Sequence, residues 1–227
     1  MLFSVVAPAY NEENVIADFI REVMEKLQKH DFELVVVNDG STDGTGNILR
    51  MLQEEYVNLR VVSHPENKGL GAALATGFNA AEGDVIVTMD ADLSHDPAHI
   101  PGMVQKVRSG HDVVVASRYV PGGGMEGVPL WRVWISRSAN AVIGLVKRWK
   151  VRDASSGFRA YRAELVKGLR GFGSGFSVQV EILRELFRKN ARVFEVPFVL
   201  TNRKAGRSKM RYLKLIPEYT KLLMGLR

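Results

Sequence analysis

Short, largely apolar stretches alternate with helical or turn-forming segments through the first 118 residues, and this alternation constrains the fold more than any other feature. The stretches cover residues 3–7, 34–37, 59–62, 84–89 and 113–116. Runs of this length and composition predict buried strands. Strands that alternate with helices predict an α/β fold with a mostly parallel, Rossmann-like sheet flanked by helices.

Helical patterns occupy several of the intervals. Residues 12–29 carry an apolar side chain at every fourth position from 15 to 27, which places these side chains on one face of a helix. Small residues favour another helix that ends near residue 81, and Pro97 is expected to begin a third that ends near residue 109. His95 and His99 have helical i, i+4 spacing, but Pro97 leaves His95 outside the helix, so we interpret them as structurally independent.

Two carboxylates, Asp90 and Asp92, follow the fourth stretch one residue apart. Residues i and i+2 of an extended chain point to the same side, so both acids are expected to face one small volume. Ligands of open α/β sheets bind beyond the carboxyl ends of the strands. Two like charges this close need a counter-charge, for which Mg²⁺ or Mn²⁺ held together with substrate phosphates is the usual solution. A solvated turn is the alternative for an isolated Asp-x-Asp.

Polar residues follow two other strands at the same predicted edge. Residues 10–12 leave the first strand, and Asp39 opens a loop with the sequence Asp-Gly-Ser-Thr-Asp-Gly. In isolation, Asp39 is equally well explained as a helix N-cap or an Asx-turn residue. A dinucleotide fingerprint is not found after the first strand, where the chain reads Pro-Ala-Tyr-Asn-Glu, and there is no Walker-type loop.

Length and charge narrow the class of protein. A chain of 227 residues with 46% hydrophobic composition can bury a substantial core, and we expect a single domain over residues 1–227. The absence of cysteine excludes disulfides, thiolate zinc sites and cysteine nucleophiles. A net charge of +6 favours nucleic acid, an anionic membrane or phosphorylated substrates as partners. No segment resembles a signal peptide or a membrane-spanning helix of about 20 apolar residues.

Four ordered motifs lie at residues 5–12, 37–43, 67–71 and 89–93, and read VVAPAYNE, VNDGSTD, NKGLG and MDADL. Together they resemble glycosyltransferase family 2 with its GT-A fold. The resemblance implies a nucleotide-sugar donor, with Asp39 on the base and Asp92 holding a metal on the diphosphate. Further donor contacts implied by the resemblance are Pro8, Tyr10, Glu12, Val37, Asp90 and Ala91.

The second half carries several further motifs. They are Ser-Arg-Tyr at residues 117–119, a glycine-rich loop at 121–127, Trp131-Arg132 with Ser136, Asp-Ala-Ser-Ser-Gly-Phe-Arg at 153–159 and Arg-Lys-Ala-Gly-Arg-Ser-Lys at 203–209. Together they resemble the motifs of polyprenyl-phosphate mannosyltransferases, the dolichol-phosphate mannose synthase group. The Gln-x-x-Arg-Trp signature of processive polysaccharide synthases is not found. The resemblance implies that Arg118, Arg132 and Ser136 bind the acceptor phosphate, and that Arg203 and Lys209 contact the donor. It therefore divides the chain into a nucleotide-sugar half, residues 1–118, and an acceptor half, residues 119–227. The residues implied to carry catalysis are Asp90, Asp92, Arg118 and Arg203.

One position departs from the family pattern. Many dolichyl members have Gln as a metal ligand where this chain has Ser94, a shorter side chain. The implied metal set is therefore Asp90, Asp92 and Ser94, with Mg²⁺ or Mn²⁺ as the cofactor. Asp153 and Glu181 are further candidates, either as carboxylates that orient a substrate or as partners of nearby arginines.

The hypothesis that follows is an inverting, metal-dependent transfer of mannose from GDP-mannose to a polyprenyl (dolichyl) phosphate. One alternative is the corresponding glucosyltransferase with UDP-glucose. Another is a basic nucleotide- or nucleic-acid-binding protein without activity, which predicts basic and aromatic residues across a sheet face. The basic residues lie instead on two predicted helices, so we expect no nucleic-acid partner.

Those two helices, at about residues 130–149 and 209–227, are predicted to be amphipathic and to lie in a membrane interface. No acid occurs between residues 130 and 152, and Trp131, Trp134 and Trp149 fall on the apolar face. A core-facing helix with a polar back is the alternative. We expect a peripheral protein on the cytoplasmic face of an anionic membrane. Because many relatives continue into transmembrane segments, the resemblance leaves two alternatives open: a chain truncated before a membrane segment, or a naturally short form that can act with a transmembrane partner.

Overall fold

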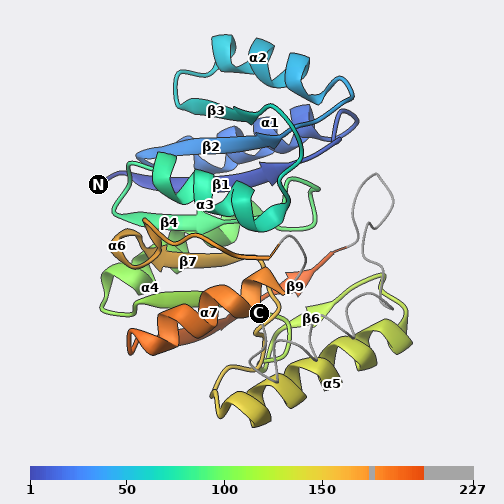
Figure 1. The fold of residues 1–227 in the computed structure, drawn as a ribbon, viewed down its shortest axis with the longest axis vertical. Coiled ribbons are helices and arrows are strands. Elements are labelled where there is room, and N and C mark those ends of the chain that lie inside the picture. The colour runs from blue at the N-terminus through green and yellow to red at the C-terminus, as the bar shows by residue number, and fades with distance from the viewer. Residues whose placement is uncertain (174–176, 202–227) are drawn as a thin grey trace.

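A computed structural model describes residues 1–173 and 177–201 of the protein (Figure 1). Arg203, Lys209 and the predicted helix at residues 209–227 lie outside the described residues. The described chain forms a seven-stranded sheet with the order β3-β2-β1-β4-β7-β5-β8. Its strands are β1 (Phe3–Ala9), β2 (Phe32–Asp39), β3 (Leu59–His64), β4 (Val85–Thr88), β5 (Val113–Ser117), β7 (Arg159–Arg162) and β8 (Val193–Pro197).

Neighbouring strands run parallel, except that β7 is antiparallel to both β4 and β5. The predicted α/β class with a mostly parallel sheet is confirmed, and each of the five predicted strands is present. Strands β7 and β8 were not predicted. Strand β7 reads Arg-Ala-Tyr-Arg, which has too few apolar residues to form a recognisable run, yet Arg159 is fully buried.

Helices cover both faces of the sheet, and a small second sheet joins β6 (Gly124–Met125) to β9 (Val199–Leu200). The helices predicted within the described residues are present with different ends, and the one predicted to begin at Pro97 starts with a 3-10 turn that precedes its α-helical part. The helices are α1 (Ile16–Leu27), α2 (Thr45–Glu55), α3 (Leu70–Ala80), the 3-10 turn η1 (Pro97–His99), α4 (Ile100–Arg108), α5 (Leu130–Lys147), α6 (Ala163–Val166) and α7 (Val178–Arg188).

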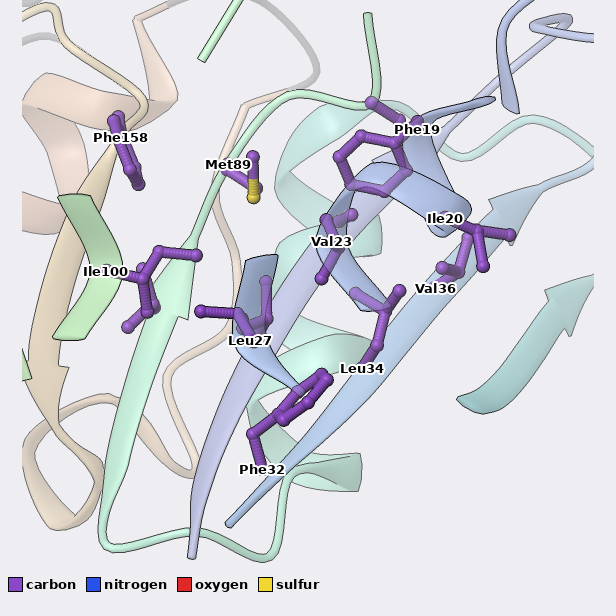
Figure 2. Packing of buried hydrophobic residues seen from close by; sticks show 14 of the residues in the cluster. Phe19, Ile20, Val23, Leu27, Phe32, Leu34, Val36, Met89, Ile100 and Phe158 are labelled. Carbon is purple, nitrogen blue, oxygen red and sulfur yellow. The ribbon is translucent and has the colours of Figure 1, made fainter. Parts of the chain in front are cut away.

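Alternation along the strands divides the core into two clusters. Val5 and Ala7 of β1 face α1, α2 and α4, whereas Val6 faces α3, α6 and α7. Figure 2 shows the first cluster, in which Phe19 and Val23 of α1 lie against the sheet. Both faces of the central strands are thus buried, as expected for a parallel sheet, and their carboxyl ends are left to carry the functional loops.

Candidate functional site

The loops after β1 and β2 are tied together at the carboxyl edge of the sheet. The Asn11 amide donates to Ser41 Oγ at 3.0 Å, and the Glu12 amide donates to Thr45 Oγ1 at 2.8 Å. In return, the Thr42 amide donates to Asn11 Oδ1 at 2.8 Å. Residues 10–12 and the loop after Asp39 therefore form one unit, as the shared sheet edge predicts.

Asp39 organises a third loop. Its buried carboxylate accepts the backbone N–H groups of Lys68 at 3.0 Å and Gly69 at 2.8 Å, and its Oδ1 lies 2.6 Å from His64 Nδ1. The N-cap of the following helix is Gly44, so Asp39 does not serve as that cap. Asp39 thus joins the second and third family motifs, a contact that their sequences do not reveal. Its contact with a nucleotide base remains a prediction.

The other implied donor residues differ in exposure. Pro8, Tyr10 and Glu12 are partly exposed at the sheet edge. Ala91 is nearly buried, and Val37 has no exposed surface because its side chain packs in the core under α3. In this structure Val37 therefore does not line a surface pocket with its side chain, in contrast to what the resemblance implies.

Asp90 and Asp92 lie in a tight turn after β4, which ends at Thr88. The extended geometry that we expected for this pair is therefore wrong. The turn is held by Ser94, whose amide and hydroxyl donate to Asp92 Oδ1 at 3.0 Å and 2.5 Å. Leu93 between them adopts a left-handed φ of 63°. Asp90 is partly exposed, whereas Asp92 and Ser94 are nearly buried.

His95 supports the same turn, because the Asp90 amide donates to His95 Nδ1 at 3.1 Å. The ring of His95 stacks on Phe158 at a centroid distance of 4.9 Å, and both His95 and His99 contact Phe198 edge-on. The two histidines therefore share one aromatic cluster, so our interpretation of them as structurally independent is wrong. Pro97 separates their helical positions, but tertiary packing brings their rings to the same phenylalanines.

The oxygen atoms at this turn are suitable ligands for a hard divalent cation. Two carboxylates and a hydroxyl from Asp90, Asp92 and Ser94 supply only oxygen, which suits Mg²⁺ and Mn²⁺. Within residues 1–173 and 177–201, no group of three or more His, Cys, Asp or Glu residues is placed to hold a metal by itself. A site with two carboxylates that is completed by substrate phosphates and water agrees with both observations.

Arg118 forms a buried, bidentate ion pair. Its Nε and Nη2 donate to the two oxygens of Asp153 at 2.7 Å and 2.6 Å, and its backbone amide donates to the same carboxylate. Burial opposes ionisation of Asp153, but the charge and hydrogen bonds of Arg118 outweigh it and hold the pKa of this carboxyl below its ordinary value. Asp153 was predicted either to orient a substrate or to pair with an arginine, and the structure shows that it pairs with Arg118.

A polar network extends from Arg118 to Ser136. Arg118 Nη2 donates to Ser155 Oγ at 2.8 Å, and Asn140 Nδ2 donates to the same oxygen at 2.9 Å. The Tyr119 hydroxyl donates to Ser136 Oγ at 2.6 Å, and burial raises the pKa of this tyrosine. Asn140 Nδ2 also donates to the Ser136 carbonyl oxygen at 2.9 Å, so two of the three implied acceptor residues, Arg118 and Ser136, are connected. Asn140 and Ser155 were not among the predicted site residues, because a neutral side chain gives no charge pattern to mark it.

Arg132 lies on α5 beside this network, and its guanidinium stacks over the ring of Trp131 at 5.2 Å.

Glu181 is the other candidate carboxylate. In the described contacts it does not pair with an arginine but accepts hydrogen bonds from Ser177 Oγ and from the Gly173 amide. These bonds hold the first turn of α7. Glu181 therefore ties Gly173 and Ser177 to the start of α7, although it forms no side-chain cap of this helix.

Helix α5 lies at the end of the molecule opposite α2 and exposes most of its length (Figure 1). Only Asn140 and Ile143 are buried along it. The alternative of a core-facing helix is therefore wrong for residues 130–147. Its large exposed apolar side chains are Leu130, Trp131, Trp134, Ile135, Val142, Leu145 and Val146.

Trp149 does not share this surface. The helix ends at Lys147, and Arg148 turns the chain with a left-handed φ of 54°. The ring of Trp149 stacks on Phe187 of α7 at 4.8 Å and packs against the second core cluster. Its assignment to the apolar face was wrong because the helical pattern was extended past the turn. Across the described residues, no helix combines the length and apolarity needed to span a bilayer.

Comparison with known proteins agrees with this architecture. The family model described as glycosyl transferase family 2 matches residues 4–170. Among solved structures, glucosyl-3-phosphoglycerate synthase from Mycobacterium tuberculosis, in complex with Mn²⁺, UDP and glucosyl-3-phosphoglycerate, superposes with a TM-score of 0.71. The alignment covers 100% of this chain and 81% of that one at 24% identity, which is evidence for a shared fold.

Curated relatives are more similar in sequence. The chain is 39% identical over 221 residues to dolichol-phosphate mannosyltransferase from Pyrococcus furiosus, a match that covers 96% of this chain. It spans only 62% of that relative's length. Polyprenol monophosphomannose synthase from Mycolicibacterium smegmatis is 34% identical, with 91% of this chain and 80% of the relative covered. Undecaprenyl-phosphate mannosyltransferase from Micrococcus luteus is 32% identical, with 90% of this chain and 86% of the relative covered.

Proposed function

The chain belongs to glycosyl transferase family 2, and from this premise we propose that it transfers mannose from GDP-mannose to a polyprenyl phosphate with inversion. Relatives at 32–39% identity that are named as mannosyltransferases of dolichol, polyprenol or undecaprenyl phosphates support the sugar and the acceptor. We propose that the whole chain acts as one domain, because β7 from the second half lies between β4 and β5 of the first.

One observation carries the proposal: residues 153–157 connect the acidic turn to the cationic network. At one end of this loop, Asp153 binds Arg118. At the other end, Gly157 lies beside Asp90, such that a Cβ on this glycine would be 3.5 Å from Asp90 Oδ1. A donor diphosphate at Asp90 and an acceptor phosphate at Arg118 would therefore meet over this loop.

The chemistry needs little from the protein beyond position and charge. A phosphate monoester with a second pKa of about 6 is mostly dianionic at neutral pH, so it attacks without a general base. Arg118, Arg132 and Ser136 would orient this dianion for attack on the anomeric carbon. Direct displacement of the nucleoside diphosphate inverts the configuration at that carbon. Asp90 and Asp92, with Ser94 bracing the turn, would hold Mg²⁺ or Mn²⁺, and such a cation neutralises charge on a diphosphate leaving group. Pro8, Tyr10, Glu12 and Asp39 would hold the nucleoside.

Radiolabelled donors test the proposal directly. The purified protein, with Mg²⁺ or Mn²⁺ and a short-chain polyprenyl phosphate, should move label from GDP-mannose into the organic phase. Label from UDP-glucose should stay in the aqueous phase. Transfer from UDP-glucose alone would instead establish the glucosyltransferase alternative, and no transfer from any nucleotide-sugar would contradict an enzymatic role.

Arg132→Ala should raise the KM for a water-soluble acceptor by about 10- to 100-fold, because a hydrogen bond to a charged group contributes about 1.5 to 3 kcal/mol. The KM for GDP-mannose should change little. Arg137→Ala, which removes an exposed arginine from the same helix, is the matched control and should leave both constants near wild type. An equal rise in the KM for GDP-mannose and for the acceptor would contradict the assignment of Arg132 to the acceptor.

We also propose that the exposed apolar face of α5 rests on a membrane and that the protein is peripheral on the cytoplasmic side. Trp134 and Ile135 are 69% and 49% exposed, and no carboxylate lies on the helix. Adding anionic phosphatidylglycerol vesicles should therefore shift tryptophan fluorescence to the blue, less so at high salt. Trp131 and Trp134 should supply the shift, since Trp149 is stacked on Phe187.

Replacing both Trp134 and Ile135 with Asp should remove the vesicle response. The same change should lower turnover of a long-chain acceptor far more than turnover of a water-soluble one, because only the former is drawn from the bilayer. Met51→Asp alters an exposed apolar residue on the distant α2 and serves as the control. Equal losses on both acceptors would contradict a membrane role for α5.

A further inference from the structure

Gln179 carries a buried polar group that the proposed mechanism does not use. It lies in the first turn of α7 and is 5% exposed. Its Oε1 is fully buried and has no hydrogen-bond partner among the residues that the structure describes. An unsatisfied buried acceptor costs about 1 to 3 kcal/mol, so such a group calls for a ligand or a bound water.

The position of this amide relates it to the acidic turn. A Cβ built on Gly157 would lie 3.3 Å from Gln179 Nε2 and 3.5 Å from Asp90 Oδ1. The amide and the carboxylate therefore flank the same glycine. At 3.3 Å such a Cβ would press against Nε2, so the glycine at residue 157 allows the amide and the carboxylate to lie this close to the backbone between them.

The backbone around Gln179 is held firmly. Arg159 is fully buried, and its two terminal nitrogens donate to the carbonyl oxygens of Gln179 and Ala154, each at 2.7 Å. This guanidinium therefore clamps the first turn of α7 to residues 153–157. The amide is thus presented beside Asp90 by a rigid support, as a specific binding residue requires.

We propose that the carboxamide of Gln179 binds a hydroxyl group of the transferred sugar and helps to select the donor. This inference rests on the proposed function. A diphosphate held at Asp90 would carry its sugar toward Arg118, across Gly157 and past Gln179. An amide offers both a donor and an acceptor to a hydroxyl group, and a neutral side chain does not repel the incoming phosphate, as a carboxylate would.

The test compares a sugar-free nucleotide with the complete donor. Calorimetry with Mg²⁺ should show that Gln179→Met binds GDP within about twofold of wild type but binds GDP-mannose about tenfold more weakly, the effect of one hydrogen bond. Gln179→Ala should behave alike and covers the case in which the Met variant misfolds. Gln105→Met replaces an exposed glutamine on α4 and should change neither affinity.

Deoxygenated donors identify the contact itself. Wild-type protein should lose about tenfold in affinity for one of the monodeoxy GDP-mannoses, and Gln179→Met should bind that analogue and GDP-mannose equally. If Gln179→Met lost affinity for GDP and GDP-mannose in parallel, Gln179 would be structural. If its affinity for both ligands matched that of wild type, the amide would bind water only. Either result overturns the inference, provided that wild-type protein transfers mannose; failure of that transfer contradicts the proposed function instead.

Discussion

Asp92→Ala is expected to lower mannose transfer about a thousandfold or more, the largest effect that we predict. Asp92 is nearly buried, and its Oδ1 is oriented by two hydrogen bonds from Ser94. Loss of this carboxylate would remove a ligand of the proposed cation, whose stabilisation of developing charge is worth several kcal/mol, and about 1.4 kcal/mol corresponds to tenfold in rate. The rate should be measured with saturating GDP-mannose and a short-chain acceptor.

Two comparisons make this result specific. Asp96→Asn changes a nearby exposed acid that caps η1, and it should retain nearly full activity. Excess EDTA should inactivate the wild-type protein, and Mg²⁺ or Mn²⁺ should restore it. Full activity in EDTA would refute the assignment of a metal to Asp90 and Asp92, even if the Asp92 variant proved inactive.

Asp153→Asn is expected to lower the free energy of unfolding by about 3 to 5 kcal/mol, because it leaves the Arg118 guanidinium without its buried partner. The side chains of Asp153 and Arg118 are 0% and 14% exposed. Urea unfolding near neutral pH measures the difference. Asp84→Asn breaks a similar bidentate pair with Arg108, but both side chains are about a third exposed, so its cost should stay below about 1 kcal/mol.

The contribution of Asp153 should also depend on pH with a definite sign. Its pKa is lowered in the folded protein from the ordinary value of 3.8. The folded state therefore favours the ionised form, and the stabilisation is fully present above about pH 3.8 and is lost as the pH falls through the folded pKa. The gap in stability between wild type and Asp153→Asn should accordingly narrow below pH 3.8. A gap that stayed constant into strong acid would contradict the ion pair.

This pair changes the interpretation of Arg118. The resemblance implies that Arg118 binds acceptor phosphate, yet much of its hydrogen-bonding capacity is directed to Asp153 and Ser155. Arg118→Ala would leave a buried carboxylate unpaired, so a loss of activity in that variant would mix folding with binding. Arg132, which stacks on Trp131 at the surface of α5, gives the cleaner test of acceptor recognition.

The sequence by itself determined the features that depend on local pattern. Strand and helix periodicity predicted the five parallel strands and α5, since alternation and helical spacing follow directly from backbone geometry. The carboxyl-edge rule placed residues 10–12, Asp39 and the acidic turn at one edge, because every strand that precedes these loops runs in the same direction. The four motifs identified the family before any contact between them was known.

Tertiary structure alone decided which distant residues meet. Strand β7 has almost no apolar pattern, so its insertion between β4 and β5 depends on pairing with strands far along the chain. That insertion brings residues 153–157 against both Arg118 and Asp90. It also places Gln179 beside the acidic turn through Arg159. These contacts arise from chain reversal and side-chain packing, which periodicity does not encode, and they connect the donor and acceptor parts of the proposed site.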